Sequence, residues 1–162
     1  LSATLAADEK SRVCRVLLID DNPHGLTARR DILAEKGYTV TIAESGEEGI
    51  GYFENEPFDL VVTDYRMPGV RGDEVVRRVK LADPNLPVVI LSGYTVPLAL
   101  TVESTGADLV LAKGPREHNE LVRAVETLLP ANVRPRPIKP ASERQSSTGV
   151  AYSRLRSRGH SA

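Results

Sequence analysis

Short apolar segments alternate with amphipathic segments along the chain up to Pro130. Most of the short segments are rich in Val, Ile and Leu, which is typical of strands buried on both faces of a parallel sheet. The predicted strands cover residues 13–19, 38–43, 58–63, 87–91 and 107–111. The predicted helices are one that follows Asn22-Pro23 and runs to about Lys36, then 44–55, 73–82 and 96–105, and a last helix that ends at Pro130. Five strands alternating with five helices predict an α/β fold with a doubly wound parallel sheet.

The predicted helix 96–105 differs from the others in its composition. It contains Pro97, Thr101, Val102 and Thr105, all of which are weak helix formers. A helix of this composition depends on tertiary packing more than on local preference. We therefore expect this segment to be a moving part of the molecule.

The apolar pattern stops after Pro130, where Pro, Ser and Arg become frequent. This tail carries a net charge of +6, whereas residues 1–129 carry −7. Such a segment buries too little apolar surface to offset the entropy of ordering. We expect an N-terminal extension at 1–11, one domain at 12–129 and a disordered basic tail at 130–162. Without a folded basic face or an aromatic platform, the tail is not expected to bind nucleic acid.

Cysteine content and apolar run lengths bear on the location of the protein. Cys14 is the single cysteine, so the chain has no intramolecular disulfide, as expected in a reducing cytoplasm. The apolar runs are far shorter than a membrane span, and Leu1–Lys10 lacks the apolar core of a signal peptide. We expect a cytoplasmic protein that does not insert into a membrane.

Chemically useful side chains follow four of the predicted strands. Asp20 and Asp21 follow the first strand and Asp64 follows the third. Ser92 follows the fourth strand and Lys113 follows the fifth. The carboxyl ends of parallel strands share one edge of a sheet, so we expect these side chains to converge.

The converging residue types suit phosphoryl transfer. Mg²⁺ takes hard oxygen ligands, and three carboxylates supply them in Asp20, Asp21 and Asp64. Phosphoryl transfer also needs a nucleophile and groups that contact the phosphoryl oxygens. Asp64 would be the nucleophile, with Lys113 and Ser92 on the phosphoryl oxygens. Each residue alone has an ordinary explanation as a helix cap, a turn residue or a solvated cation, so the prediction depends on the combination.

Four segments resemble the receiver domain of response regulators, the module of two-component signalling typified by the chemotaxis regulators. They are Leu18–Asn22, Val62–Gly69, Ile90–Tyr94, and Gly106–Asp108 leading to Lys113. The resemblance covers about 12–129 and implies a flavodoxin-like sheet of order 2-1-3-4-5. It implies a signalling domain that catalyses only its own phosphorylation and dephosphorylation, not an enzyme that acts on other substrates.

The resemblance also assigns roles within the site. Asp64 would accept a phosphoryl group from the phosphohistidine of a histidine kinase or a phosphotransfer protein. Asp21, Asp64 and the backbone carbonyl of Arg66 would bind Mg²⁺, while Asp20 would act largely through a coordinated water. Arg66 and Tyr94 would flank the phosphoryl group and tune its hydrolysis, although simple surface exposure explains these two residues equally well.

Two positions depart from the family pattern. Val110 stands where the family has an aromatic residue that turns inward on activation, and a β-branched side chain is nearly fixed in χ1. Gly114 stands where a proline usually follows the lysine. We therefore expect the signal to leave the site through Gly93–Thr95 and the weak helix 96–105.

The sequence thus predicts a phosphorylatable receiver domain that signals to a protein partner, with homodimer formation left open. One alternative is the C-terminal receiver of a hybrid histidine kinase, which a chain beginning with Leu1 permits. Another is a pseudo-receiver, an interaction module not controlled by phosphorylation. A metal-dependent phosphatase is disfavoured because the Asp-x-Asp arrangement after the first strand is missing. A flavin carrier is disfavoured because the loop after Asp21 lacks the Ser, Thr and Gly residues that would cradle a phosphate.

Overall fold

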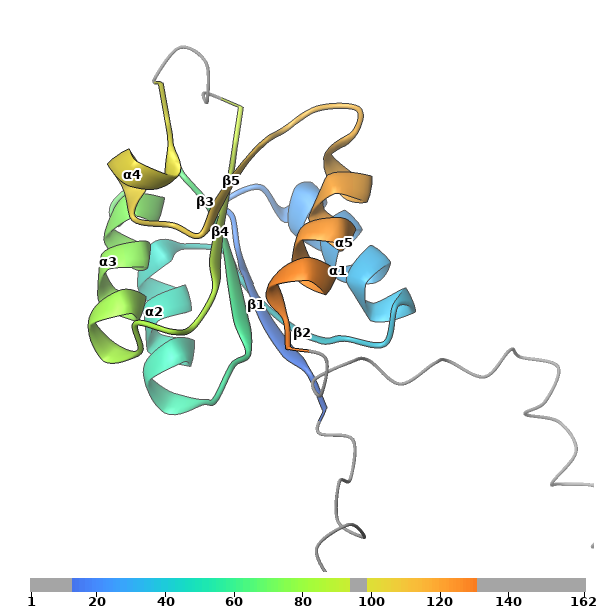
Figure 1. The fold of residues 1–162 in the computed structure, drawn as a ribbon, viewed down its shortest axis with the longest axis horizontal. Helices are drawn as coiled ribbons and strands as arrows, with labels where there is room; N and C mark the ends of the chain where they lie inside the picture. The colour runs from blue at the N-terminus through green and yellow to red at the C-terminus, as the bar shows by residue number, and fades with distance from the viewer. Residues whose placement is uncertain (1–12, 94–98, 131–162) are drawn as a thin grey trace, which may run out of the picture.

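A computed structural model of the protein describes residues 13–93 and 99–130. These residues form a five-stranded parallel sheet of order β2-β1-β3-β4-β5 flanked by helices (Figure 1). In chain order, the elements are β1 (Arg15–Ile19), α1 (Pro23–Glu35), β2 (Thr39–Ala43), α2 (Gly46–Asn55), β3 (Leu60–Asp64), α3 (Gly72–Ala82), β4 (Val88–Ser92), α4 (Val102–Thr105), β5 (Leu109–Ala112) and α5 (Glu117–Leu128). The predicted α/β fold, strand order and alternation are confirmed.

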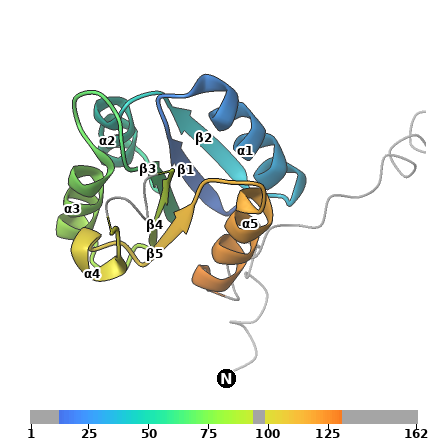
Figure 2. The ribbon, with the colours of Figure 1, turned by 90° about the horizontal axis from the view of Figure 1, so that it is seen from above.

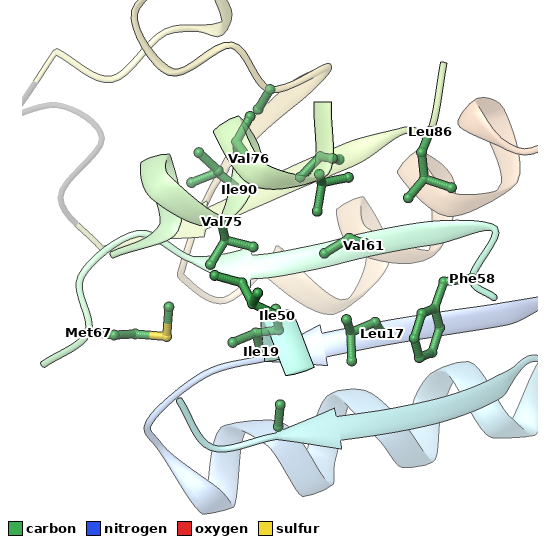
Figure 3. Close-up of a cluster of buried hydrophobic side chains, with 14 residues drawn as sticks. Leu17, Ile19, Ile50, Phe58, Val61, Met67, Val75, Val76, Leu86 and Ile90 are labelled. Atoms are coloured by element: carbon green, nitrogen blue, oxygen red, sulfur yellow. The ribbon is translucent and has the colours of Figure 1, made fainter. Parts of the chain in front are cut away.

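The helices cover the two faces of the sheet as two separate layers. Figure 2 shows α1 and α5 on one face and α2, α3 and α4 on the other. Side chains along β1 alternate between them, because successive residues of a strand point to opposite faces. Val16 and Leu18 enter the cluster under α1 and α5, whereas Leu17 and Ile19 enter the cluster under α2 and α3 (Figure 3). Cys14 is buried in the first cluster, as expected for a packing residue.

Local signals explain where the first two helices begin. The side chain of Asn22 accepts hydrogen bonds from the backbone amides of His24 and Gly25, and Pro23 occupies the first turn of α1. Ser45 caps α2 in the same way through the amide of Glu48. Such caps satisfy amides that have no partner within the helix. Gly37 adopts a left-handed backbone (φ 94°) just after α1, a conformation in which glycine commonly ends a helix.

The predicted elements agree with the observed ones except at their ends and in α4. Each strand begins one or two residues later than predicted, as is common where strand and helix ends fray. The prediction of a helix over 96–105 was wrong for its described part, because α4 covers only Val102–Thr105. Thr101 accounts for the late start: it caps α4, and its side chain and that of Ser104 accept each other's backbone amides. Residues 94–98 lie outside the described part.

Asp108 contacts the start of β4, at the end of the sheet opposite the carboxyl ends of the strands. One oxygen of its carboxylate accepts the backbone amide of Val88 and the ammonium of Lys80, both at 2.7 Å. The Gly-Ala-Asp segment is therefore structural in this protein. No helix among the described residues is long and apolar enough to cross a membrane.

Candidate phosphoryl-accepting site

Four strand ends bring the predicted site residues to one edge of the sheet. Asp64 ends β3, Ser92 ends β4, and Asp20 and Lys113 directly follow β1 and β5. Lys113 Nζ lies 2.8 Å from Asp20 Oδ2 and 3.2 Å from Asp64 Oδ1. One carboxylate oxygen from each of Asp20, Asp21 and Asp64 lies within 4.8 Å of the other two. The structure thus brings three carboxylates and one ammonium together, as the sequence predicts.

The buried carboxylates Asp20 and Asp64 have opposite pKa shifts. Burial opposes ionisation of Asp20, but hydrogen bonds from Lys113 and Asn22 and the charges of Lys113 and Arg29 outweigh it and lower its pKa. Burial also raises the pKa of Asp64, the charge of Asp20 adds to that effect, and Lys113 offsets it only in part. Asp64 is therefore the buried carboxylate whose ionised form this site disfavours.

The structure places the other predicted residues less completely. Ser92 is buried at the end of β4, where it pairs in register with Ala112, and its carbonyl accepts the amide of Lys113 at 3.0 Å. Arg66 is exposed in the loop after β3. Tyr94 lies outside the described residues.

A tight loop joins Asp64 to α3. The amide of Gly72 donates to the carbonyl of Tyr65 at 2.9 Å, which folds the loop back on its own start. A Cβ atom at Gly72 would lie 2.3 Å from the carbonyl oxygen of Asp64, so only glycine fits. Glu47 of α2 fixes the middle of the loop by accepting the amide of Val70 at 3.0 Å. The backbone that carries Asp64 and Arg66 is therefore well fixed.

Sequence reasoning missed two charged residues beside the site, Arg29 of α1 and Glu117 of α5. Arg29 Nη1 donates to Asp20 Oδ2 at 2.7 Å, and Arg29 Nε donates to a carboxylate oxygen of Glu117. Both side chains are buried. A signal was present in the sequence: Arg29 falls between Leu26 and Leu33 at the spacing of a buried helix stripe, where a charged residue is unexpected.

The donor set fits the divalent cation that the sequence predicts. Mg²⁺ prefers carboxylate oxygens and keeps several waters. Asp20 and Asp64 are buried and Asp21 is exposed, so the cluster offers carboxylate oxygens from both the interior and the solvent side. A cation there would also favour the ionised form of Asp64, whose pKa is raised by burial and by the charge of Asp20.

Comparison with known proteins identifies the class to which this sheet and site belong. The family model of the response regulator receiver domain matches residues 16–126. The chain therefore belongs to the response regulator receiver family and is a receiver domain of two-component systems. The family match therefore favours neither a metal-dependent phosphatase nor a flavin carrier.

Particular relatives come from both regulators and sensors. Transcriptional regulatory protein GlrR of Escherichia coli (strain K12) is 33% identical over 115 residues, which are 70% of this chain and 26% of GlrR. Virulence sensor protein BvgS of Bordetella pertussis is 39% identical over 83 residues, which are 51% of this chain and 7% of BvgS. The chain thus spans only a small part of the length of these relatives.

A solved structure shares the fold. Response regulator protein TrrA from Thermotoga maritima, in complex with Mg²⁺-BeF, superposes with a TM-score of 0.66 and is 31% identical. The match covers 72% of this chain and 100% of the TrrA chain. Receiver domains are signalling modules, and this relative was crystallised with the cation that the acidic cluster suits.

Proposed function

We propose that this receiver domain accepts a phosphoryl group on Asp64 from a phosphohistidine and reports it to a protein partner. The observation that carries the proposal is the contact of Lys113 with both Asp64 and Asp20 at the carboxyl edge of the sheet. An ammonium shared by two carboxylates can follow negative charge as it builds on one of them.

The chemistry follows from the groups present. A carboxylate oxygen of Asp64 attacks phosphorus in line with the P–N bond of phosphohistidine, forming a P–O bond as the P–N bond breaks. The imidazole keeps the electron pair and takes a proton from solvent. Lys113 pairs with one phosphoryl oxygen and the hydroxyl of Ser92 donates to another. These steps concern the domain's own phosphorylation and the later hydrolysis, and no other substrate is proposed.

The metal site uses the same carboxylates. Asp21, Asp64 and the backbone carbonyl of Arg66 would hold Mg²⁺, and Asp20 would contact it largely through water. When bound, the cation neutralises charge between the carboxylates and the incoming phosphoryl oxygens. Arg66 and Tyr94 would border the phosphoryl group and tune its hydrolysis. The exposed position of Arg66 supports that assignment.

The proposal extends to domain limits, location and partners. We assign the receiver unit to residues 12–129, with an extension before it and a basic tail after it. The single cysteine, buried in the core, supports a location in the reducing cytoplasm. The phosphoryl donor would be a histidine kinase or a phosphotransfer protein, and homodimer formation stays open. Similarity to BvgS supports the alternative that this receiver belongs to a sensor protein.

A phosphorylation assay tests the assignment of Asp64. The protein is incubated with acetyl phosphate and Mg²⁺ and its intact mass is measured. The parent should gain the mass of one phosphoryl group, and Asp64→Asn should gain none. Asp31→Asn serves as a matched control, because Asp31 is an exposed aspartate of α1 that pairs with Arg30 outside the site. Equal labelling of the parent and Asp64→Asn contradicts the assignment, and no labelling of the parent favours the pseudo-receiver.

A further inference from the structure

Arg29 occupies an unusual place for a charged residue. It lies in the middle of α1 on the stripe that faces the core, with only 6% of its surface exposed. Leu26 and Leu33 on the same stripe are fully buried in the cluster under α1 and α5. Burying a guanidinium is costly unless it is paired and hydrogen-bonded. The position of Arg29 therefore calls for a reason beyond core packing.

The guanidinium of Arg29 bridges two carboxylates on different elements. Nη1 donates to Asp20 at 2.7 Å, and Nε donates to Glu117 in the first turn of α5. A planar group with donors on two sides can hold two partners in fixed directions, which a lysine ammonium cannot do as well. Gly25 leaves room for it, because a Cβ atom there would lie 2.9 Å from Arg29 Nη1.

The contact with Asp20 is not needed to join α1 to α5. The Arg29–Glu117 ion pair already links the two helices without that contact. Apolar residues of similar volume in place of a buried ion pair often give equal or greater stability. The added contact reaches a residue of the acidic cluster. Asp20 Oδ1 accepts the amide of Asn22 at 2.9 Å, while Oδ2 accepts both Lys113 at 2.8 Å and Arg29 at 2.7 Å.

Phosphoryl transfer would change this arrangement. If Lys113 turns towards a phosphoryl group on Asp64, Oδ2 of Asp20 loses one of its two side-chain donors. Arg29 remains in contact with it. A lone cation there would also oppose binding of a divalent cation, but the negative charge of Glu117 balances Arg29.

We propose that Arg29 is a positioning residue of the site, which keeps the carboxylate of Asp20 oriented while Lys113 changes partner, and that Glu117 balances its charge so that Asp20 still attracts the divalent cation. This inference rests on the proposed function. It adds two residues from α1 and α5 to the site, so the orientation of a carboxylate in the acidic cluster depends on how these two helices pack.

The test measures Mg²⁺ affinity without any phosphorylation. Backbone amide shifts of Asp21 and Asp64 are followed by NMR while MgCl₂ is added. The first variant is the double substitution Arg29→Met with Glu117→Leu, which removes the pair without changing net charge. Loss of an outer-shell partner typically weakens metal affinity about 10- to 100-fold, and we expect at least about a tenfold loss here.

A second variant separates charge from geometry. Glu117→Gln keeps an acceptor for Arg29 Nε but removes the balancing charge, so Mg²⁺ should bind at least about threefold more weakly. A residue that serves only to join α1 and α5 would leave Mg²⁺ affinity unchanged in this variant. Glu117→Gln also keeps the proposal testable if the double variant fails to fold.

A matched control removes another Arg–Glu pair. Arg15 of β1 and Glu56 form a half-buried pair with N···O at 2.6 Å at the opposite end of the strand from Asp20. Arg15→Met with Glu56→Leu should leave Mg²⁺ affinity within about twofold of the parent, a difference far below that of an outer-shell loss.

The outcomes separate this inference from the proposed function. If the parent binds Mg²⁺ and the Arg29 and Glu117 variants bind it within about twofold as well, the positioning role is wrong while the proposed function stands. If the control variant loses affinity as much as the double variant, the effect is general destabilisation and the positioning role is again wrong. If the parent shows no Mg²⁺-dependent shifts, the metal part of the proposed function fails and the inference falls with it.

Discussion

The two faces of the sheet are covered by helices that are held in different ways. Under α1 and α5, a buried ion pair between Arg29 and Glu117 lies beside the apolar cluster and continues to Asp20. Under α2 and α3, the helices pack on a cluster of buried apolar side chains (Figure 3), and α4 is a single short helix. The α1–α5 face is therefore linked to the site by directional contacts between charged groups. The α2–α3 face is linked to it by apolar packing and by the loop that joins Asp64 to α3.

This difference suggests how each face responds when the site changes. Directional contacts between full charges resist displacement, because a shift of one group leaves a buried charge unpaired. A short helix held by packing and one cap has alternative arrangements within a few kcal/mol. The α1–α5 face should then fix the geometry of the site, and the α4 region should carry the change outward.

The largest expected effect is on stability, and it compares one substitution on each face. Arg29→Met leaves Glu117 buried without its partner and should cost about 3–5 kcal/mol of unfolding free energy. Val76→Ala, in the apolar cluster under α3, should cost about 2 kcal/mol. Adding Glu117→Leu to Arg29→Met should recover most of the loss. Urea unfolding without Mg²⁺ measures all three, and a smaller loss for Arg29→Met than for Val76→Ala would mean that the two faces do not differ as described.

Mg²⁺ should have the next largest effect, on both faces at once, because the acidic cluster lies at the sheet edge that they share. A ligand that binds only the folded state stabilises it by about 2.7 kcal/mol at 100 times its Kd. Asp21→Ala should lose most of that gain. Thermal unfolding with and without millimolar MgCl₂ is the measurement. If millimolar MgCl₂ does not change the melting temperature of the parent, the acidic cluster is not a metal site.

The two buried carboxylates should respond to pH in opposite directions. The pKa of Asp64 is raised, first by burial, so its ionised form costs stability above that pKa. Asp64→Asn should therefore raise the Tm by a few degrees near neutral pH without Mg²⁺. That gain should vanish as the pH falls through the folded-state pKa of Asp64, where the parent carboxyl takes up its proton.

Asp20 provides the opposite case. Its pKa is lowered despite burial, because Lys113, Asn22 and Arg29 stabilise the charge. It therefore contributes stability above its unfolded pKa, and that contribution is lost as the pH falls through the lower folded pKa. Thermal scans of the parent, Asp64→Asn and Asp20→Asn across acidic pH would show the contrast. A stabilising effect of Asp20→Asn near neutral pH would contradict it.

The smallest expected effect is a redistribution of hydrogen exchange when a phosphoryl mimic binds. With beryllofluoride and Mg²⁺, changes should concentrate in residues 92–106 and be smaller around Val110. Val110 is partly buried against the cluster under α2 and α3 and is nearly fixed in χ1. The amides of α1 and α5 should change least. Largest changes in β5 and α5 would reverse the assignment of fixed and moving faces.

Most of the site could be predicted because its residues stand directly at strand ends. Asp20, Asp64, Ser92 and Lys113 need only the topological rule that parallel strands end at one edge. The convergence of the carboxylates and Lys113 is confirmed by the contacts that join them. The roles of Ser92 and Arg66 in phosphoryl transfer stay predictions.

The missed features depend on distant contacts or on competing local signals. Arg29 and Glu117 are 88 positions apart, so the position of Arg29 on the buried stripe of α1 does not show which residue pairs with it. The composition of 96–105 indicates a weak helix but does not show where α4 begins. Thr101 and Ser104 fix the start of α4 through paired hydrogen bonds that a composition argument does not include.

The separation of Arg29 and Glu117 also has a consequence for synthesis and for chimeras. The ribosome completes α1 long before α5 emerges, so the nascent α1 carries a core-facing guanidinium that can pair with Asp20 but whose second partner, Glu117, does not yet exist. Packing that surface early would bury the guanidinium with one of its two carboxylate partners missing, which favours a delay until the last helix is made. For the same reason, a hybrid built from two receivers should take α1 and α5 from the same parent. Exchanging only one of these two helices would break the Arg29–Glu117 pair and leave a buried charged group without that partner.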